Sequence, residues 1–277
     1  MKKLGIIGGA GPLASALFYE TLVQESYRLQ QALPEILLLN YPFTRGLTVE
    51  ENQRSGSISR QELLHCLNTL EVGGATLAVL VCNTLHLELA RIPHPGAIPK
   101  STQKLGVRRV QSAENRFLQR GSYCQYKPPL QESISRQLSI PPDAQLLSAF
   151  GYMHLLRIPD CVLKEVCKRG DKRLLLLGTQ TTCASSLYSQ TGITLLCPSV
   201  EAQGVVDRVI DHVLEGHICA EDARLIEQVI EGFAEAIDGV ILGCTDLPVL
   251  HHHFPIHSTK SIYDSVKISA KTILRYL

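Results

Sequence analysis

Two short stretches of this sequence, far apart in the chain, have nearly the same pattern: VLVCNTLH at residues 79–86 and VILGCTDLP at residues 240–248. Each is an apolar run of strand length that ends at a cysteine followed by small polar residues. In α/β folds such strand ends lie beside the first turns of helices, where ligands bind. We therefore expect Cys82 and Cys244 to face each other across a small anionic molecule, an arrangement that suits proton transfer on the two sides of a carbon atom.

Short apolar runs alternate with stretches of helical periodicity along the chain. Buried parallel strands are expected at 4–7, 36–39, 77–81, 174–177, 193–196 and 240–242, and helices at 13–24, 59–70, 160–168, 205–214 and 220–236. Residues 2–8 and 172–178 share a second pattern, in which a basic pair and an apolar strand lead to a glycine. The sequence thus predicts an α/β fold of two pseudo-symmetric, doubly wound domains with parallel sheets and the active site between them.

The expected domain organisation follows from this repeat. Residues 1–99 form the first α/β domain, completed by an amphipathic C-terminal helix at 261–277 that packs back on it, and residues 153–260 form the second. The connecting segment, 100–152, begins with many basic residues, carries two Pro-Pro pairs and has little strand character. We expect a solvated excursion here; the alternative is a cap over the cleft or an oligomer contact.

The composition excludes several classes of protein. The chain has 277 residues and a formal charge of +1, which gives no global reason to expect a nucleic-acid partner. No apolar run approaches the roughly 20 residues of a membrane span, so no membrane partner is expected. Nine cysteines without C-x-x-C spacing indicate free thiols in a reducing cytoplasm and no metal site. The three consecutive histidines at 251–253 point in different directions and are interpreted as surface residues.

Cys82 and Cys244 are the predicted catalytic residues, because helix N-termini beside strand ends lower the pKa of a thiol and favour the thiolate. The alternative for any buried cysteine is a small apolar side chain. That interpretation serves for four others: Cys66, Cys161, Cys167 and Cys197. Cys183 follows the second glycine turn and is expected to support the cleft at most.

Groups that bind a carboxylate are expected at the same turns. The glycine turn at 8–14 predicts an anion-binding helix N-terminus, with Gly9 and Gly11 at the ligand. Its loose dinucleotide pattern lacks the acidic residue expected after the second strand, so we expect a small ligand instead. Amide and hydroxyl donors complete the set, although each also suits a helix N-cap: Asn83, Thr84, Thr179, Thr182 and Thr245. Arg45, in the loop after the second strand, is the candidate for a second carboxylate.

His86 and Asp246 each allow two interpretations. A lone histidine is more often structural than catalytic, and His86 follows Cys82 by only four residues. Asp246 either orients a group at the second thiol or caps a helix.

Three motifs, at 5–14, 82–86 and 243–248, together resemble those of the aspartate/glutamate racemase family, on the aspartate-racemase side. The resemblance covers most of the chain outside 100–152. It implies racemisation without pyridoxal phosphate or another cofactor, with Cys82 and Cys244 as acid and base. It places carboxylate binding and the substrate arginine at these positions: Asn83, Thr84, Thr245, the turn at 178–182, and Arg45. The chain departs from the family pattern at Ala10, usually Met, and at Asp246, usually Glu.

The expected function is therefore racemisation of a small amino acid, aspartate or glutamate, by two cysteines. Two alternatives stay open: an isomerase of a related dicarboxylate that lacks the amino group, and a binding or regulatory protein with a degenerate racemase cleft. Apart from the substrate, the one expected partner is a second copy of the chain, in a homodimer.

Overall fold

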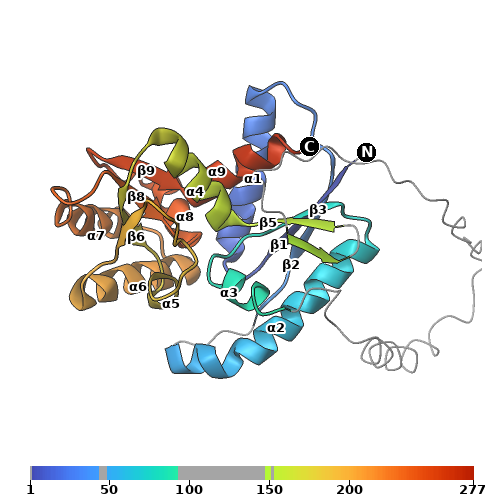
Figure 1. Cartoon of the computed structure of the whole chain (residues 1–277), viewed down its shortest axis with the longest axis horizontal. Coiled ribbons are helices and arrows are strands. Elements are labelled where there is room, and N and C mark those ends of the chain that lie inside the picture. Colours follow the sequence, from blue (N-terminus) through green and yellow to red (C-terminus); the bar gives the residue numbers. More distant parts are fainter. Residues whose placement is uncertain (1, 44–48, 93–146, 151–152) are drawn as a thin grey trace, which may run out of the picture. The chain divides into compact units, whose positions relative to one another are not determined.

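The computed structural model describes residues 2–43, 49–92, 147–150 and 153–277. Its elements (Figure 1) are β1 (Lys3–Gly8), α1 (Pro12–Arg28), β2 (Glu35–Asn40), α2 (Val49–Val72), β3 (Leu77–Leu80), α3 (Leu85–Leu89), β4 (Leu147–Phe150), β5 (Met153–Leu156), α4 (Ile158–Arg169), β6 (Arg173–Leu177), α5 (Gln180–Cys183), β7 (Thr194–Leu196), α6 (Val200–Leu214), α7 (Ala220–Glu231), β8 (Gly239–Leu242), α8 (Asp246–His253), β9 (Ser261–Asp264) and α9 (Ser265–Leu274). No helix in these ranges is long and apolar enough to cross a membrane.

The strands form two sheets with the same internal order. The first sheet has the order β2-β1-β3-β5-β4 and the second has the order β7-β6-β8-β9. All neighbouring strands are parallel except β4, which pairs antiparallel with β5 at the sheet edge. β1, β2, β3 and β5 therefore correspond to β6, β7, β8 and β9. This repeat confirms the predicted α/β fold with two parallel sheets flanked by helices.

Helices α1 and α2 flank the first sheet (Figure 1), and the side chains of β1 alternate between them. Leu4 and Ile6 belong to the same apolar cluster as Phe18 of α1, whereas Ile7 belongs to the cluster of Leu67 on α2. Neighbouring strand residues point to opposite faces, so α1 and α2 cover opposite faces of the sheet. The cluster on the α1 side continues through β6 and β8 of the second sheet. The two halves therefore share the apolar cluster on the α1 side, whereas the cluster on the α2 side belongs to the first half.

The C-terminal segment differs from the sequence-based expectation. Residues 261–264, predicted to begin a helix, form β9, which pairs with β8 at the edge of the second sheet. The helix α9 begins only after Asp264, whose side chain accepts a hydrogen bond from the Lys267 N–H. α9 then packs against α1 and α4. A four-residue strand is too short to show a period of its own, and its pairing with a distant strand decides its structure.

The segment before the second half also needs correction. Residues 147–150, predicted to have little strand character, form β4 beside β5. β5 itself, at the predicted start of the second domain, pairs with β3 of the first sheet. The predicted helix at 220–236 ends at Glu231 and is followed by a turn at Gly232. The domain boundaries as a whole stay a prediction.

The turn after β1 requires glycine, which gives the first testable prediction. Gly9 has φ +105°, and a Cβ atom there would lie 2.0 Å from the Tyr41 carbonyl oxygen. Gly9→Ala should therefore lower the free energy of unfolding, measured by chemical denaturation, by at least about 2 kcal/mol. Gly204→Ala is the matched control, because a Cβ at this exposed site on α6 meets no atom within 4 Å. It should raise stability by about 0.5–1 kcal/mol; equal effects at both sites would contradict the interpretation.

Candidate active site

The turns that follow β1, β3, β6 and β8 meet in a reciprocal arrangement. The turn after β3, with Thr84, contacts the turn after β6, where the Thr84 hydroxyl lies 3.2 Å from that of Thr179. The turn after β1 contacts the turn after β8, because a Cβ on Gly11 would lie 2.4 Å from Asp246 Oδ1. Each cysteine-bearing turn of one half thus contacts the glycine turn of the other half.

Three threonine hydroxyls form a cluster where the first pair of turns meets. Thr84 Oγ1 lies 3.2 Å from Thr179 Oγ1 and 3.3 Å from Thr182 Oγ1, and the Thr179 hydroxyl donates to that of Thr182 at 3.1 Å. Thr179 also caps α5, where its side chain accepts the Thr182 N–H. Thr84 and Thr245 stand at the N-caps of α3 and α8 without a side-chain capping bond. The Thr179 hydroxyl is therefore explained by helix capping. The hydroxyls of Thr84 and Thr245 form no capping bond and can bind another group.

Cys82 is partly buried, and a neutral histidine holds the backbone of its turn. The Nδ1–H of His86 donates to the Cys82 carbonyl oxygen at 2.7 Å, and His86 Nε2 accepts the Ile158 N–H at 3.3 Å. A carbonyl only accepts and a backbone N–H only donates, so the neutral tautomer follows from the two partners. Complete burial, with a smaller contribution from the charge of Arg157, lowers the pKa of His86 to about 4. His86 is thus a structural link between the Cys82 turn and the start of α4.

Cys244 is buried beside a carboxylate. Its thiol donates to Asp246 Oδ2 at 3.3 Å. Burial raises the pKa of Cys244 well above its ordinary value, and the charges of Asp246 and Cys82 raise it further. In this state Cys244 carries its proton and Asp246 is positioned to accept it.

Asn83 offers a donor for a ligand. The hydroxyl of Tyr188, which is fully buried, donates to Asn83 Oδ1 at 2.8 Å. Nδ2 of Asn83 is buried and has no hydrogen-bond partner among the described residues. Because Tyr188 occupies the oxygen end of the amide, the N–H₂ end is the one left to bind a substrate oxygen.

The glycine turns act mainly through shape. The N–H of Gly9 donates to the Ser15 hydroxyl at 3.1 Å, so this donor is engaged within the chain, contrary to a simple anion-binding role. Gly11 is the N-cap of α1 and leaves room for Asp246. The predicted substrate arginine, Arg45, lies outside the described residues. In the described ranges no group of three or more His, Cys, Asp or Glu side chains has the geometry of a metal site.

Three residues that support the site were missed by sequence reasoning: Ser15, Tyr188 and Gln203. The Ser15 hydroxyl donates to the Gly11 carbonyl, and the buried Gln203 side chain donates to the Gly178 carbonyl at 2.9 Å. Tyr188 lies between α5 and β7, in a stretch with no helical or strand period. Only the glycine and cysteine turns that they support gave a signal, because a hydroxyl or amide that reaches a distant turn leaves no local pattern.

A comparison with protein families bears on the second half of the chain. Residues 145–273 match the model of the Asp/Glu/Hydantoin racemase family. This match includes β8, Cys244 and α9, and it confirms the family resemblance predicted from the sequence motifs. It supports an amino-acid racemase activity.

Solved structures of similar fold cover nearly the whole chain. An aspartate racemase homologue from Pyrococcus horikoshii has 22% sequence identity and a TM-score of 0.62, over 99% of this chain and 98% of that one. The aspartate racemase of Picrophilus torridus has 20% identity and a TM-score of 0.63, over 100% and 99% of the two chains. The glutamate racemase of Campylobacter jejuni has 14% identity and a TM-score of 0.56, over 99% and 86%. At these identities the likeness shows the fold.

The neutral state of His86 predicts a loss of stability in acid. Its folded pKa of about 4 lies below the ordinary value of 6.5, so the unfolded chain takes up the proton first as the pH falls. The contribution is fully present above pH 6.5 and is lost progressively down to about pH 4, by about 2 kcal/mol at pH 4.5. Chemical denaturation at several pH values measures this loss.

His86→Gln tests the assignment, since a glutamine amide can donate to Cys82 and accept from Ile158 but does not titrate. This variant should lose that part of the pH dependence. The matched control is His217→Gln at an exposed site, which should keep the wild-type slope. An unchanged slope in His86→Gln would refute the structural role given to this histidine.

Proposed function

We propose that this protein racemises aspartate or glutamate without a cofactor, with Cys82 and Cys244 on opposite sides of the substrate Cα atom. The observation that carries the proposal is the reciprocal contact of the two equivalent cysteine turns, each with the glycine turn of the other half. The racemase family match supports the reaction class. The choice of an acidic amino acid rests on the family resemblance.

The proposed reaction removes the α-proton from one face of the carbon and adds a proton to the opposite face. For one enantiomer, the Cys82 thiolate takes the α-proton, so that a C–H bond breaks and an S–H bond forms. The electron pair passes into the substrate carboxylate as an enediolate. The Cys244 thiol then delivers its proton to the opposite face and is left as the thiolate. For the other enantiomer the roles exchange: the Cys244 thiolate takes the α-proton and the Cys82 thiol delivers its proton to the opposite face, which restores the first state of the two thiols.

The unequal surroundings of the two thiols suit this pairing. Burial and the Asp246 charge keep the proton on Cys244, as an acid requires. The less buried Cys82 lies in the turn fixed by His86. Two groups of one kind whose environments separate their pKa values are typical of acid–base pairs.

The site must also stabilise negative charge on the substrate, because an amino-acid α-proton is a far weaker acid than a thiol of ordinary pKa, about 8.5. The free Nδ2 of Asn83 and the hydroxyls of Thr84, Thr182 and Thr245 are the donors that we assign to the substrate carboxylate. They are already held by the fold, so little reorganisation accompanies the reaction. A role for Arg45, assembly as a homodimer and a cytoplasmic location stay predictions.

Exchange of the α-proton in D₂O tests the proposal. Purified protein incubated with L- or D-aspartate, and separately with L- or D-glutamate, should incorporate deuterium at Cα of one pair and form the opposite enantiomer, measured by NMR and chiral chromatography. Cys82→Ser and Cys244→Ser should each reduce racemisation at least about 100-fold, since each removes an acid–base group. Cys167→Ser, at an exposed cysteine on α4, should keep wild-type activity.

The outcomes separate the alternatives. Deuterium exchange with a dicarboxylate that lacks the amino group, and with neither amino acid, would favour the isomerase. Binding of an amino acid without exchange, unaffected by either cysteine variant, would favour a ligand-binding protein. Either result would overturn the racemase proposal.

Tyr188→Phe tests how Asn83 is oriented. Loss of the hydroxyl leaves the buried Asn83 Oδ1 without this donor, so stability should fall by about 1–3 kcal/mol, and kcat/KM should fall roughly tenfold as the amide loses its orientation. Tyr263→Phe is the matched control, because that buried hydroxyl donates to Asp171 away from the thiols. It should lower stability but leave kcat/KM unchanged. An equal loss of kcat/KM in both variants would contradict the positioning role given to Tyr188.

A further inference from the structure

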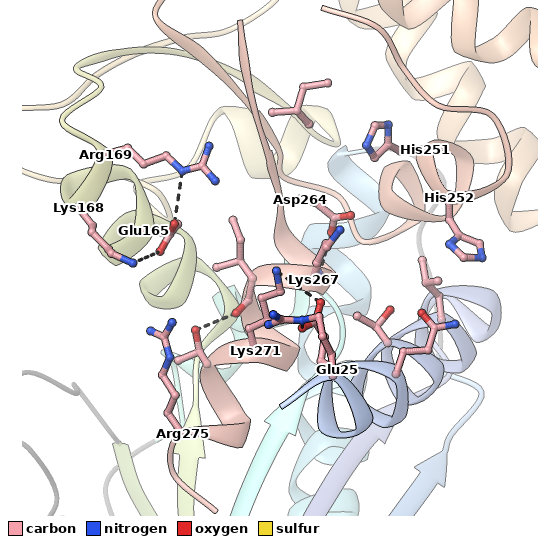
Figure 2. A pocket seen from close by; sticks show the side chains of 17 residues that line it. Glu25, Glu165, Lys168, Arg169, His251, His252, Asp264, Lys267, Lys271 and Arg275 are labelled. Carbon is pink, nitrogen blue, oxygen red and sulfur yellow. Dashed lines mark hydrogen bonds and ion pairs between the residues drawn. The ribbon is translucent and has the colours of Figure 1, made fainter. Parts of the chain in front are cut away.

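A polar cavity lies away from the candidate active site. Its volume is about 690 Å³, within the range of ligand sites. Side chains from α1, α4, α8, β9 and α9 line it (Figure 2). Neither the cysteine turns nor the glycine turns contribute to it.

Positive charge is concentrated in this cavity. Among the lining residues are six basic and three acidic side chains, an excess of three positive charges, whereas the whole chain has an excess of only one. The basic residues are Arg28, Lys168, Arg169, Lys267, Lys271 and Arg275. The cavity is therefore suited to an anion, and the cations on three helices can reach more than one anionic group.

Two of the carboxylates are each shared by two cations. Glu25 pairs with Arg28 at 2.6 Å and with Lys271 at 3.4 Å. Burial raises the pKa of Glu25, but the hydrogen bond from Arg28 and the charge of Lys271 outweigh it and hold the pKa below its usual value. Glu165 pairs with Lys168 and Arg169. Each of these two groups keeps a net positive charge.

The third carboxylate is used within the chain. Asp264 caps α9 by accepting the Lys267 N–H, and burial raises its pKa. Lys267 and Arg275, both exposed, form no ion pair with any described residue. Figure 2 shows that their side chains come from the two ends of α9. His251 is half-buried here, contrary to the predicted surface position, and its Nδ1 accepts the Ile256 N–H.

Helix dipoles do not account for every cation. Arg28, Lys168 and Arg169 lie in the last turns of α1 and α4, where a positive charge is favourable. Lys267 lies in the first turn of α9, where the dipole disfavours it, and the one carboxylate at that end, the N-cap Asp264, forms no ion pair with it. Lys267 is thus an exposed cation at an unfavourable helix position, and an anion from outside the chain would stabilise it.

Three of the lining helices also begin at the candidate active site. α1 follows Gly11, α8 follows Thr245, and the first N–H of α4 donates to His86. Later turns of the same helices reach the cavity with Arg28, His251 and Arg169. An occupant would therefore contact elements that also position both cysteines.

We propose that this cavity binds a small polyanion with two or more phosphate or carboxylate groups. Lys267 and Arg275 would hold it together with the cations of α1 and α4 that pair with Glu25 and Glu165. The proposal does not rest on the racemase function, because it concerns a separate set of side chains and a binding reaction.

Isothermal titration of the full-length protein with tripolyphosphate, and in a separate arm with citrate, tests the proposal and distinguishes the two kinds of anion. Wild-type protein should bind at least one probe, with an affinity that falls as salt is raised. The double variant Lys267→Gln/Arg275→Gln should weaken binding at least about tenfold, since it removes two charge-assisted contacts. The matched control, Lys164→Gln/Arg208→Gln, removes two exposed cations outside the cavity and should change affinity less than about twofold.

Several results would overturn the proposal. One is the absence of binding of either probe to the wild-type protein. Another is an equal loss of affinity in both double variants, which would indicate non-specific electrostatic attraction. Light scattering serves as a second readout: if Lys267→Gln/Arg275→Gln changes the oligomeric state, the cavity faces a second copy of the chain instead of a small ligand. Equal thermal unfolding midpoints of the two double variants would exclude a folding defect as the cause of weaker binding.

Discussion

The candidate active site depends on a reciprocal contact between the two halves of the fold. The Thr84 hydroxyl reaches Thr179 and Thr182 across the boundary, and Gly11 leaves the space that Asp246 occupies on the other side. Neither α/β unit could assemble this set of groups by itself, because each cysteine turn is completed by the opposite glycine turn. The apolar cluster that runs through both sheets holds the contact in place. The geometry of the site therefore depends on packing in the core.

Pseudo-symmetry of the backbone does not make the two thiols equivalent. Cys244 is buried against a carboxylate, and burial together with that charge keeps its proton bound. Cys82 is less buried, and an uncharged histidine holds the turn on which it stands. A duplicated scaffold can thus supply two matching positions whose local burial and charge differ. Acid–base chemistry that works from two faces of a carbon needs one protonated and one deprotonated group at a time, and different surroundings suit that division.

Sequence reasoning succeeded where a pattern was local. The apolar runs that became β1, β3, β6 and β8, and the repeated order of glycine and cysteine turns, were predicted from periodicity and spacing. It failed where structure depends on partners distant in sequence: β5 pairs with a strand 77 residues earlier, and β9 is too short to show a period. Tyr188 belongs to the same class of failure, since its hydroxyl reaches Asn83 from another half of the fold. Asp264 is an aspartate directly before a helix, which is a typical N-cap signal. The sequence analysis missed it because the helix was expected to begin at residue 261.

His86 has a consequence for how this chain can change over evolutionary time. Its ring joins the Cys82 carbonyl to the first N–H of α4, and these two points are separated in sequence by about seventy residues. The bond secures the cysteine turn directly to the helix that follows, whatever sequence connects them. Chain inserted or deleted between α3 and β4 therefore need not displace the thiol. This junction is therefore a place where the chain can accept new sequence, and with it new binding or assembly properties, without moving the cysteine turn.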